Sequence, residues 1–360
     1  MSGPGLSRRD FGLLAAAASL APALASAAAV QPLIIAEGGA AEERIEDTAS
    51  ALALAIDQGS DFVQVNLFPT SDGVLVARRD NELSATTDIA ARPEFAARRT
   101  TKTLDGQAVQ GWFTEDFTLA ELKTLFCRER LAGMRPQNLR YNGKEPILTL
   151  PEVLQLARDG CVRTARTVGV CPRLMRVAYF AGLGLPVDER LARELTTEGY
   201  VAPAAAIWVQ ALEPDVLNGF ARLSPVRRMQ LIDADRAAGM TTGAALAAIR
   251  GYAEAIAPDQ DLLIDPNAAA FPAPTTLTLD AHGAGLQVFS RTARIENAFL
   301  PPALRRGDKQ SPAFPDGHGD VDKLLLALFA NGVDGVATDL PRRAAHARAD
   351  AIAALQQPDR

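Results

Sequence analysis

The stretch FVQVNLFPTSDGVLVA at residues 62–77 contains the pattern that decides the fold. Apolar and polar residues alternate over 62–68, as expected for a β-strand with two different faces. Asp72-Gly73 is a tight-turn signal, and the apolar residues 74–77 that follow it complete a hairpin. This segment therefore predicts a strand that turns back on itself at the edge of a larger sheet.

A strand followed by a helix or loop recurs on both sides of this hairpin. Residues 33–36 form a short apolar strand, and a helix is expected from about residue 42 to residue 58. Six further apolar segments have the length of strands: 167–170, 206–209, 229–232, 255–257, 286–289 and 335–338. Helices are expected between them at 187–198, 214–222, 242–254 and 320–330, with an Ala-rich helix at the end. Eight such strands predict an α/β fold, a single (β/α)8 TIM barrel rather than two domains.

A doubly wound open sheet is the alternative fold. Its first strand would lead into a glycine-rich phosphate-binding loop, and Glu37-Gly38-Gly39 does not have the required spacing. Residues 84–145 are polar and irregular, so we expect them to form an insertion after the second-strand hairpin. The barrel domain is then expected to cover residues 30–360.

Composition and charge limit the classes of partner. The chain has 360 residues, 48% of them hydrophobic, a net charge of -6 and a pI near 5.3. Its arginine pairs are scattered, and no basic stripe stands clear of neighbouring acids. Nucleic acid is therefore not an expected partner.

The N-terminus has the features of an export signal. Ser7-Arg8-Arg9-Asp10-Phe11 is similar to a twin-arginine motif, and an Ala-rich apolar run with small-residue cleavage options follows it. Pro22 interrupts this run, which lacks bulky residues, so no membrane span is expected. We therefore predict a signal peptide at residues 1–29 and a periplasmic or secreted protein.

In a barrel of this kind, chemistry is located at the carboxyl ends of the strands. Glu37 follows the first predicted strand, and Gln64 and Asn66 lie near the end of the second. Arg79 comes just after the hairpin, and Arg173 follows the strand at 167–170. The predicted site thus combines one acid, two amides and two arginines, without a histidine.

Four longer segments identify a family: Asp72 to Arg78, Arg98 to Thr103, Gly111 to Thr118 and Glu296 to Pro301. In these segments, and over nearly all of residues 32–341, the chain resembles the exported bacterial branch of the glycerophosphodiester phosphodiesterase family. This resemblance implies a TIM barrel of the phospholipase C-like phosphodiesterase type. It also implies hydrolysis of glycerophosphodiesters to glycerol 3-phosphate and an alcohol, assisted by a divalent cation, commonly calcium.

The acid/base and phosphate-binding positions of the family are substituted in this chain. The family's His-Arg-Gly aligns with Glu37-Gly38-Gly39, so Glu37 replaces a catalytic histidine and Gly38 replaces a phosphate-binding arginine. Arg79 aligns with the second catalytic histidine, and Met175 aligns with a phosphate-binding lysine. Arginine does not deprotonate near neutral pH, so Arg79 cannot act as a general base.

The metal-binding positions are also altered. Glu46 is the one acid that the resemblance leaves intact, whereas the family's Glu-x-Asp has become Gln64-Val65-Asn66. The third-strand glutamate aligns with Arg173, a permanent cation that would repel a metal ion at short range. We hypothesise that Arg79 and Arg173 occupy the space of the cation and pair with Glu37 and Glu46.

These substitutions predict a non-catalytic family member, a pseudoenzyme that binds a small anionic or phosphate-containing ligand or a partner. No cofactor is expected in that case. The alternative is an active phosphodiesterase with reassigned residues, in which Glu37 is the acid/base group and Arg79 and Arg173 hold the phosphate. Calcium or magnesium would be the cofactor if the family activity persists.

Overall fold

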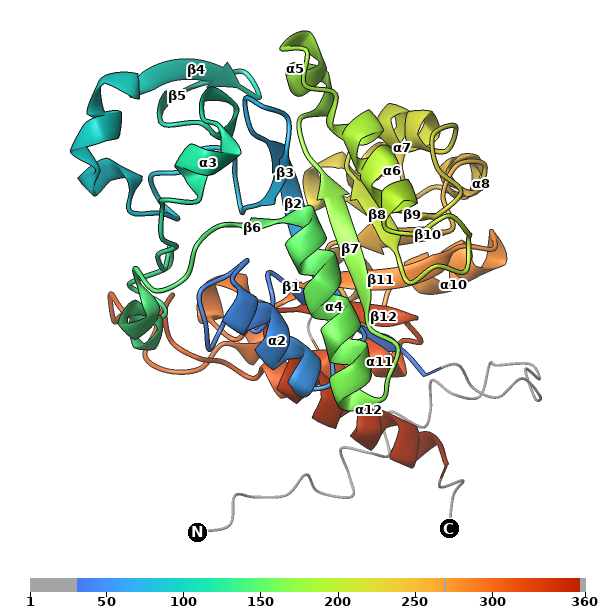
Figure 1. Cartoon of the computed structure of the whole chain (residues 1–360). Coiled ribbons are helices and arrows are strands. Elements are labelled where there is room, and N and C mark those ends of the chain that lie inside the picture. Colours follow the sequence, from blue (N-terminus) through green and yellow to red (C-terminus); the bar gives the residue numbers. More distant parts are fainter. Residues whose placement is uncertain (1–30, 269, 357–360) are drawn as a thin grey trace. The chain divides into compact units, whose positions relative to one another are not determined.

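The computed structural model describes residues 31–268 and 270–356 (Figure 1). The expected signal peptide at residues 1–29 lies outside these described residues. Eight parallel strands form the centre of the fold: β1 (Leu33–Glu37), β2 (Phe62–Pro69), β7 (Gly169–Leu174), β8 (Trp208–Ala211), β9 (Arg227–Ile232), β10 (Ala255–Pro258), β11 (Gln287–Ala293) and β12 (Gly335–Thr338). Each strand predicted from the sequence overlaps one of these.

The eight strands close on themselves. β1 pairs in parallel with β12 on one side and with β2 on the other, so no open edge is left among the eight. The prediction of a single (β/α)8 barrel is confirmed, and the alternative of a doubly wound open sheet is excluded.

Strand alternation explains how the barrel positions polar groups. Successive side chains of a strand point to opposite faces, so alternate residues point into the barrel. The interior is apolar near the strand starts, where the Trp208 and Phe289 rings lie 5.5 Å apart. Toward the carboxyl ends, the register places Glu37 beside Gln64 and sets Arg173 between Asn66 and Gln210. The predicted site residues therefore share one end of the barrel.

Helices follow most of the strands and cover the outside of the barrel (Figure 1). Their bounds are α2 (Ala49–Asp57), α4 (Leu150–Thr164), α5 (Val177–Gly182), α6 (Val187–Thr197), α7 (Pro214–Phe220), α8 (Gly243–Arg250), α9 (Gln260–Leu263), α10 (Leu277–Gly283), α11 (Val321–Ala330) and α12 (Pro341–Leu355). Within residues 31–268 and 270–356, no helix has both the length and the apolar character needed to cross a bilayer.

The first helix is shorter than the sequence predicts. α2 begins at Ala49, and the Thr48 side chain caps it by accepting a hydrogen bond from the Ala51 amide. Asp47 has φ +59°, a left-handed conformation that a right-handed helix does not accommodate. The expected helix from about residue 42 was therefore wrong over residues 42–48, about two turns, and those residues instead form a loop beside the barrel mouth.

The hairpin strand β3 (Leu75–Ala77) pairs with β2 and with β6 (Leu148–Thr149), and an insertion lies between β3 and β6. The insertion contains the hairpin of β4 (Thr100–Leu104) and β5 (Gln107–Gly111), and the short helix α3 (Leu119–Leu122). An apolar cluster beneath it contains Ile45, Val76, Leu83, Ile89, Phe95, Trp112, Phe117, Leu122, Leu125, Cys127 and Ile147. The prediction of an irregular segment missed the β4–β5 hairpin.

Candidate functional site

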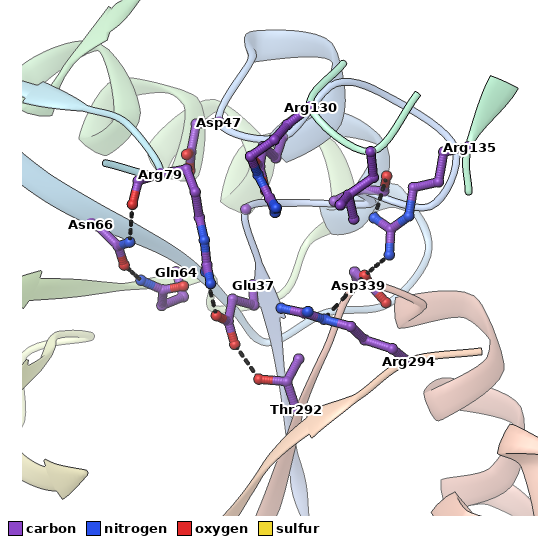
Figure 2. Close-up of a pocket in the computed structure, with 14 residues that line it drawn as sticks. Glu37, Asp47, Gln64, Asn66, Arg79, Arg130, Arg135, Thr292, Arg294 and Asp339 are labelled. Atoms are coloured by element: carbon purple, nitrogen blue, oxygen red, sulfur yellow. Dashed lines mark hydrogen bonds and ion pairs between the residues drawn. The ribbon is translucent and has the colours of Figure 1, made fainter. Parts of the chain in front are cut away.

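A polar cavity lies at the carboxyl ends of the barrel strands (Figure 2). Its lining consists of Glu37, Gly38, Ala41, Glu46, Asp47, Gln64, Asn66, Arg79, Arg130, Leu131, Arg135, Thr292, Arg294 and Asp339. Six of the residues predicted from the sequence are in this lining: Glu37, Gly38, Glu46, Gln64, Asn66 and Arg79. Arg173 lies behind Glu37, and Met175 packs half-buried against the main hydrophobic core.

Glu37, the last residue of β1, is held by three donors. Its Oε1 accepts hydrogen bonds from Arg79 Nη1 at 3.2 Å and Arg173 Nη1 at 3.3 Å, and its Oε2 accepts from Thr292 Oγ1 at 2.5 Å. Burial by itself would raise the pKa of Glu37, but the two guanidinium groups outweigh burial and hold this pKa far below its usual range. Glu37 is therefore a fixed anion near neutral pH, and it has no proton to donate.

The two arginines that pair with Glu37 differ in burial. The Arg173 side chain is 7% exposed, and its Nε also donates to Gln210 Oε1 at 3.2 Å. The Arg79 side chain is 35% exposed, and its Nη1 makes the pair with Glu37. Burial lowers the pKa of Arg173, and Glu37 offsets only part of that effect. Arg173 is thus buried within the barrel, whereas Arg79 lies at the cavity mouth.

The two amides that replace family acids are bonded to one another. Gln64 Nε2 donates to Asn66 Oδ1 at 2.9 Å, and Asn66 Nδ2 donates to the Arg79 carbonyl at 2.9 Å (Figure 2). Asn66 thereby fixes the backbone at Arg79. The amides act as connectors in a hydrogen-bond chain, and the Asn66 oxygen already has a donor.

Glu46 is paired with an arginine that the sequence did not point to. Arg130 Nε donates to Glu46 Oε1 at 2.8 Å, and Arg130 Nη2 donates to Glu46 Oε2 at 3.2 Å. Burial would raise the pKa of Glu46, but its hydrogen bonds and charge attraction to Arg130 lower it. The hypothesis that Arg79 and Arg173 pair with Glu37 agrees with the structure, whereas the partner of Glu46 is Arg130 from the insertion.

Asp47 is a second acid in the cavity lining. Burial raises its pKa to about 7, and the neighbouring Glu46 carboxylate adds to this rise, while Arg78 and Arg79 oppose it. Among the residues that the structure describes, no arginine forms a salt bridge with Asp47, in contrast to Glu37 and Glu46. Its pKa of about 7 places the ionisation of Asp47 close to neutral pH.

Two glycines shape the turn after β1. Gly38 has φ +68°, and a Cβ there would lie 3.1 Å from Glu46 Cβ, so the turn has little room for a side chain. Gly39 has φ +90°, and a Cβ would lie 2.5 Å from the Ala51 carbonyl carbon. A side chain at position 38 would therefore require Glu46 to shift by a few tenths of an ångström, in a backbone conformation that L residues rarely adopt.

A second ion-pair network closes the other side of the cavity. Arg135 Nε donates to Glu296 Oε1 at 2.7 Å, Nη1 donates to the Ala41 carbonyl at 2.9 Å, and Nη2 donates to Asp339 Oδ2. Arg294 Nε lies 3.7 Å from Asp339 Oδ2. Burial raises the pKa of Asp339 by more than Arg135 lowers it. This network joins the insertion to the ends of β11 and β12.

The side chains nearly fill the cavity. The volume open to the centre of a water molecule is about 20 Å³, little more than the ~10–15 Å³ that one water requires. A glycerophosphodiester does not fit into such a space without movement of the lining residues.

Comparison with known proteins assigns the family. The glycerophosphoryl diester phosphodiesterase family matches residues 38–343. The chain belongs to this family. It is 32% identical over 332 residues to a glycerophosphodiester phosphodiesterase of Arabidopsis thaliana, covering 86% of this chain and 84% of the plant protein. It is also 25% identical over 189 residues to a glycerophosphodiester phosphodiesterase of Haemophilus influenzae, covering half of each chain.

Solved structures of this family share the fold. A glycerophosphodiester phosphodiesterase from Agrobacterium tumefaciens aligns with a TM-score of 0.57 and 17% identity, covering 88% of this chain and 99% of that chain. An Oleispira antarctica phosphodiesterase, solved in complex with the product sn-glycerol-3-phosphate, aligns with a TM-score of 0.57 and 18% identity, covering 88% of this chain and 96% of that chain. At these identities the likeness concerns the barrel alone.

The residues of this family member do not fit the divalent cation that the family resemblance implies. Calcium and magnesium prefer several anionic oxygens, but Glu46 is bound by Arg130 and Glu37 is bound by Arg79 and Arg173. Among the described residues, no group of three or more His, Cys, Asp or Glu side chains is arranged to hold a metal ion. In the described part of the chain, no histidine lines the cavity either.

The cavity residues contributed by the insertion were not predicted from the strand ends. Arg130 and Arg135 lie in a loop far along the chain from any barrel strand, and no local pattern relates them to Glu46 or Asp339. Thr292 lies within a segment that strand-end reasoning does mark, at the end of β11. Only the need for a cation to neutralise Glu46 pointed toward an arginine such as Arg130.

Proposed function

We propose that this protein is a non-hydrolytic member of the glycerophosphoryl diester phosphodiesterase family, which binds an anionic ligand or partner without cleaving a phosphodiester. The observation that best supports this proposal is the pairing of Glu37 with Arg79 and Arg173. Internal cations neutralise the acid at the position of a catalytic histidine, where the reaction would need a group able to move a proton.

The loss of acid/base catalysis at the two family histidine positions accounts for the expected loss of turnover. A positioned general acid or base contributes roughly 10²–10⁴-fold to a rate, and both of the family's histidine positions are substituted. Arg79 cannot accept a proton near neutral pH. Glu37 is fully ionised there because Arg173 and Arg79 lower its pKa despite burial. Neither residue can protonate a leaving group.

An active phosphodiesterase with reassigned residues is the alternative, because relatives are named as phosphodiesterases. In that reaction Glu37 would be the base, and Arg79 and Arg173 would stabilise the phosphoryl group. The lowered pKa of Glu37 makes its carboxylate a weak base, and three hydrogen bonds already occupy its oxygens. The geometry therefore favours the non-hydrolytic proposal.

The decisive experiment measures hydrolysis of glycerophosphocholine by the purified mature protein, with and without calcium. We expect no glycerol 3-phosphate above the blank in either condition. Glu37→Ala serves as the control variant. Calcium-dependent turnover in the wild type that disappears in Glu37→Ala would refute the proposal and establish the alternative.

A thermal melt in calcium tests the metal separately from turnover. A ligand that binds the folded state raises stability by RT ln(1 + [L]/Kd). Because Glu46 is engaged by Arg130 and Arg173 is a fixed cation, we expect no change in Tm with millimolar calcium or magnesium. A dose-dependent rise in Tm would contradict this expectation.

We also propose that the protein is exported to the periplasm or secreted. The support is the twin-arginine-like sequence Ser7-Arg8-Arg9-Asp10-Phe11 followed by an Ala-rich run. Cell fractionation should find the wild type outside the cytoplasm and the variant with Arg8→Lys and Arg9→Lys inside it. Equal export of both proteins would contradict the twin-arginine route.

A further inference from the structure

Three arginines from different parts of the chain converge on the cavity. Arg79 follows β3, Arg130 lies in the insertion, and Arg294 follows β11, and their side chains point toward a common space (Figure 2). Guanidinium groups repel one another, so their convergence requires anions to compensate them. Within the described residues, carboxylates lie near these arginines, but not every guanidinium N–H group has a hydrogen-bond acceptor.

Arg294 is the least well paired of the three arginines. Within the described residues its buried Nε has no hydrogen-bond partner, and its nearest carboxylate oxygen is Asp339 Oδ2 at 3.7 Å. Arg79 uses only Nη1 toward Glu37. A buried donor without a partner costs free energy, so an acceptor near the Arg294 Nε would be favourable.

Arg130 already shows the geometry of such an interaction. Its bidentate pair with Glu46 is the arrangement in which arginine binds carboxylates and phosphates. The pair is releasable, because the Arg130 side chain is 26% exposed and that of Glu46 is 16% exposed. Arg135, by contrast, is 4% exposed and tied to two acids, so it is fixed.

We propose that Arg79, Arg130 and Arg294 form a binding site for a small phosphate oxyanion, and that Glu46 is an internal competitor that occupies Arg130 when the site is empty. The inference rests on the proposed non-hydrolytic function, because a metal-dependent enzyme would use Glu46 for its cation. The ligand displaces Glu46 from Arg130 and supplies the acceptor that Arg294 lacks.

The size and charge of the cavity define the class of ligand. The small free volume excludes an extended diester unless lining side chains such as Arg130 move. The amides Gln64 and Asn66 are uncharged members of the lining and add no repulsion toward an anion. A phosphate group fits these requirements, whether free or attached to glycerol, since both present several oxygens to a guanidinium cluster.

Titration calorimetry with inorganic phosphate and with glycerol 3-phosphate tests the site in the absence of divalent cations. Arg294→Ala should weaken binding roughly tenfold or more, the effect of losing a charge-assisted hydrogen bond. Glu46→Gln should strengthen binding, because it removes the competing charge. Arg163→Ala is a matched control, since Arg163 pairs with Asp57 on the surface outside the cavity and should leave affinity unchanged.

At a cation site, Glu46→Gln would weaken binding of the cation. The direction of the effect of Glu46→Gln therefore separates an anion site from a cation site. Equal affinity in the wild type, Arg294→Ala and Glu46→Gln would overturn the inference, as would an absence of heat with both ligands. If Arg294→Ala does not fold, the comparison of the wild type with the conservative Glu46→Gln still decides. Turnover of glycerophosphocholine would refute the non-hydrolytic function by a separate measurement. A difference between the two ligands would show whether glycerol contributes.

Discussion

Replacing Arg173 with methionine removes a buried guanidinium while keeping most of the side-chain volume. In the wild type, Arg173 and Glu37 are 7% and 8% exposed, so solvent screens their pair little. Breaking a buried pair by removing one partner costs about 3–5 kcal/mol. Arg79 and Thr292 still hold Glu37 in the variant, and they reduce the expected loss to about 3 kcal/mol. For a domain of this length, that loss lowers Tm by roughly 4 °C.

Thermal unfolding followed by circular dichroism measures this loss, and a double variant isolates its cause. Glu37→Gln alone leaves Arg173 buried without its acid and should also destabilise the protein. The combination Arg173→Met with Glu37→Gln removes both charges, and replacing a whole buried pair is often neutral. We therefore expect the double variant to be more stable than Arg173→Met alone, and the coupling free energy to be at least 1 kcal/mol, roughly the scale seen for contacting residues.

Lowering the pH gives an independent check. The folded-state pKa of Glu37 is depressed by Arg173 and Arg79, so its stabilising contribution is present above the unfolded value of about 4.5 and is lost as the pH falls below it. The difference in Tm between the wild type and Arg173→Met should therefore shrink as the pH is lowered from 7 to below 4.5. An unchanged Tm for Arg173→Met at pH 7, or a double variant no better than the single one, would refute the ion-pair account of this cavity.

Three other variants test the remaining features of the cavity lining. Asp47→Asn should raise Tm more at pH 8 than at pH 4, because a pKa raised from 3.8 in the unfolded chain to about 7 in the folded protein makes folding lose stability as the pH rises between these two values; an equal effect at both pH values would contradict this reason. Gly38→Ala should cost about 1–2 kcal/mol for its positive φ and lower Tm more than Gly106→Ala, where φ is +81° but the space is open; equal losses would argue against the crowded turn. Gln64→Glu combined with Asn66→Asp should not create a calcium-dependent rise in Tm, because the nearby guanidinium groups remain, and such a rise would show that the two amides alone prevent metal binding.

The barrel could be predicted because its pattern is local. Each strand is a short apolar run, and strand alternation alone determines that Glu37, Gln64 and Arg173 face the interior at one end. The β4–β5 hairpin also had a local signal, the Asp105-Gly106 turn between two segments of strand length. The surrounding sequence is polar and both strands are largely exposed, so no alternation of apolar residues marks them as strands.

The partners within the site could be predicted only in part. Pairing of Glu37 with Arg79 and Arg173 follows from charge balance among strand ends, which the sequence shows. Pairing of Glu46 with Arg130 does not, because it depends on the path of a loop that returns over the barrel mouth. Local propensity contains no information about that path. Charge counting therefore indicates that acids are neutralised, but the structure is needed to show by which arginine.

The ion pairs of the cavity join segments that are far apart along the chain. Glu37 is separated by 136 residues from Arg173 and by 255 residues from Thr292. Distant contacts stabilise a chain only after the intervening loop has closed, so the bond between Thr292 and Glu37 forms only when β11 docks. A nascent chain that lacks β11 has to shield Glu37 without one of its three donors. A misregistered β11 would leave the buried Glu37 carboxylate without its Thr292 donor, so pairing in this cavity favours the chain in which the barrel has closed in the correct register.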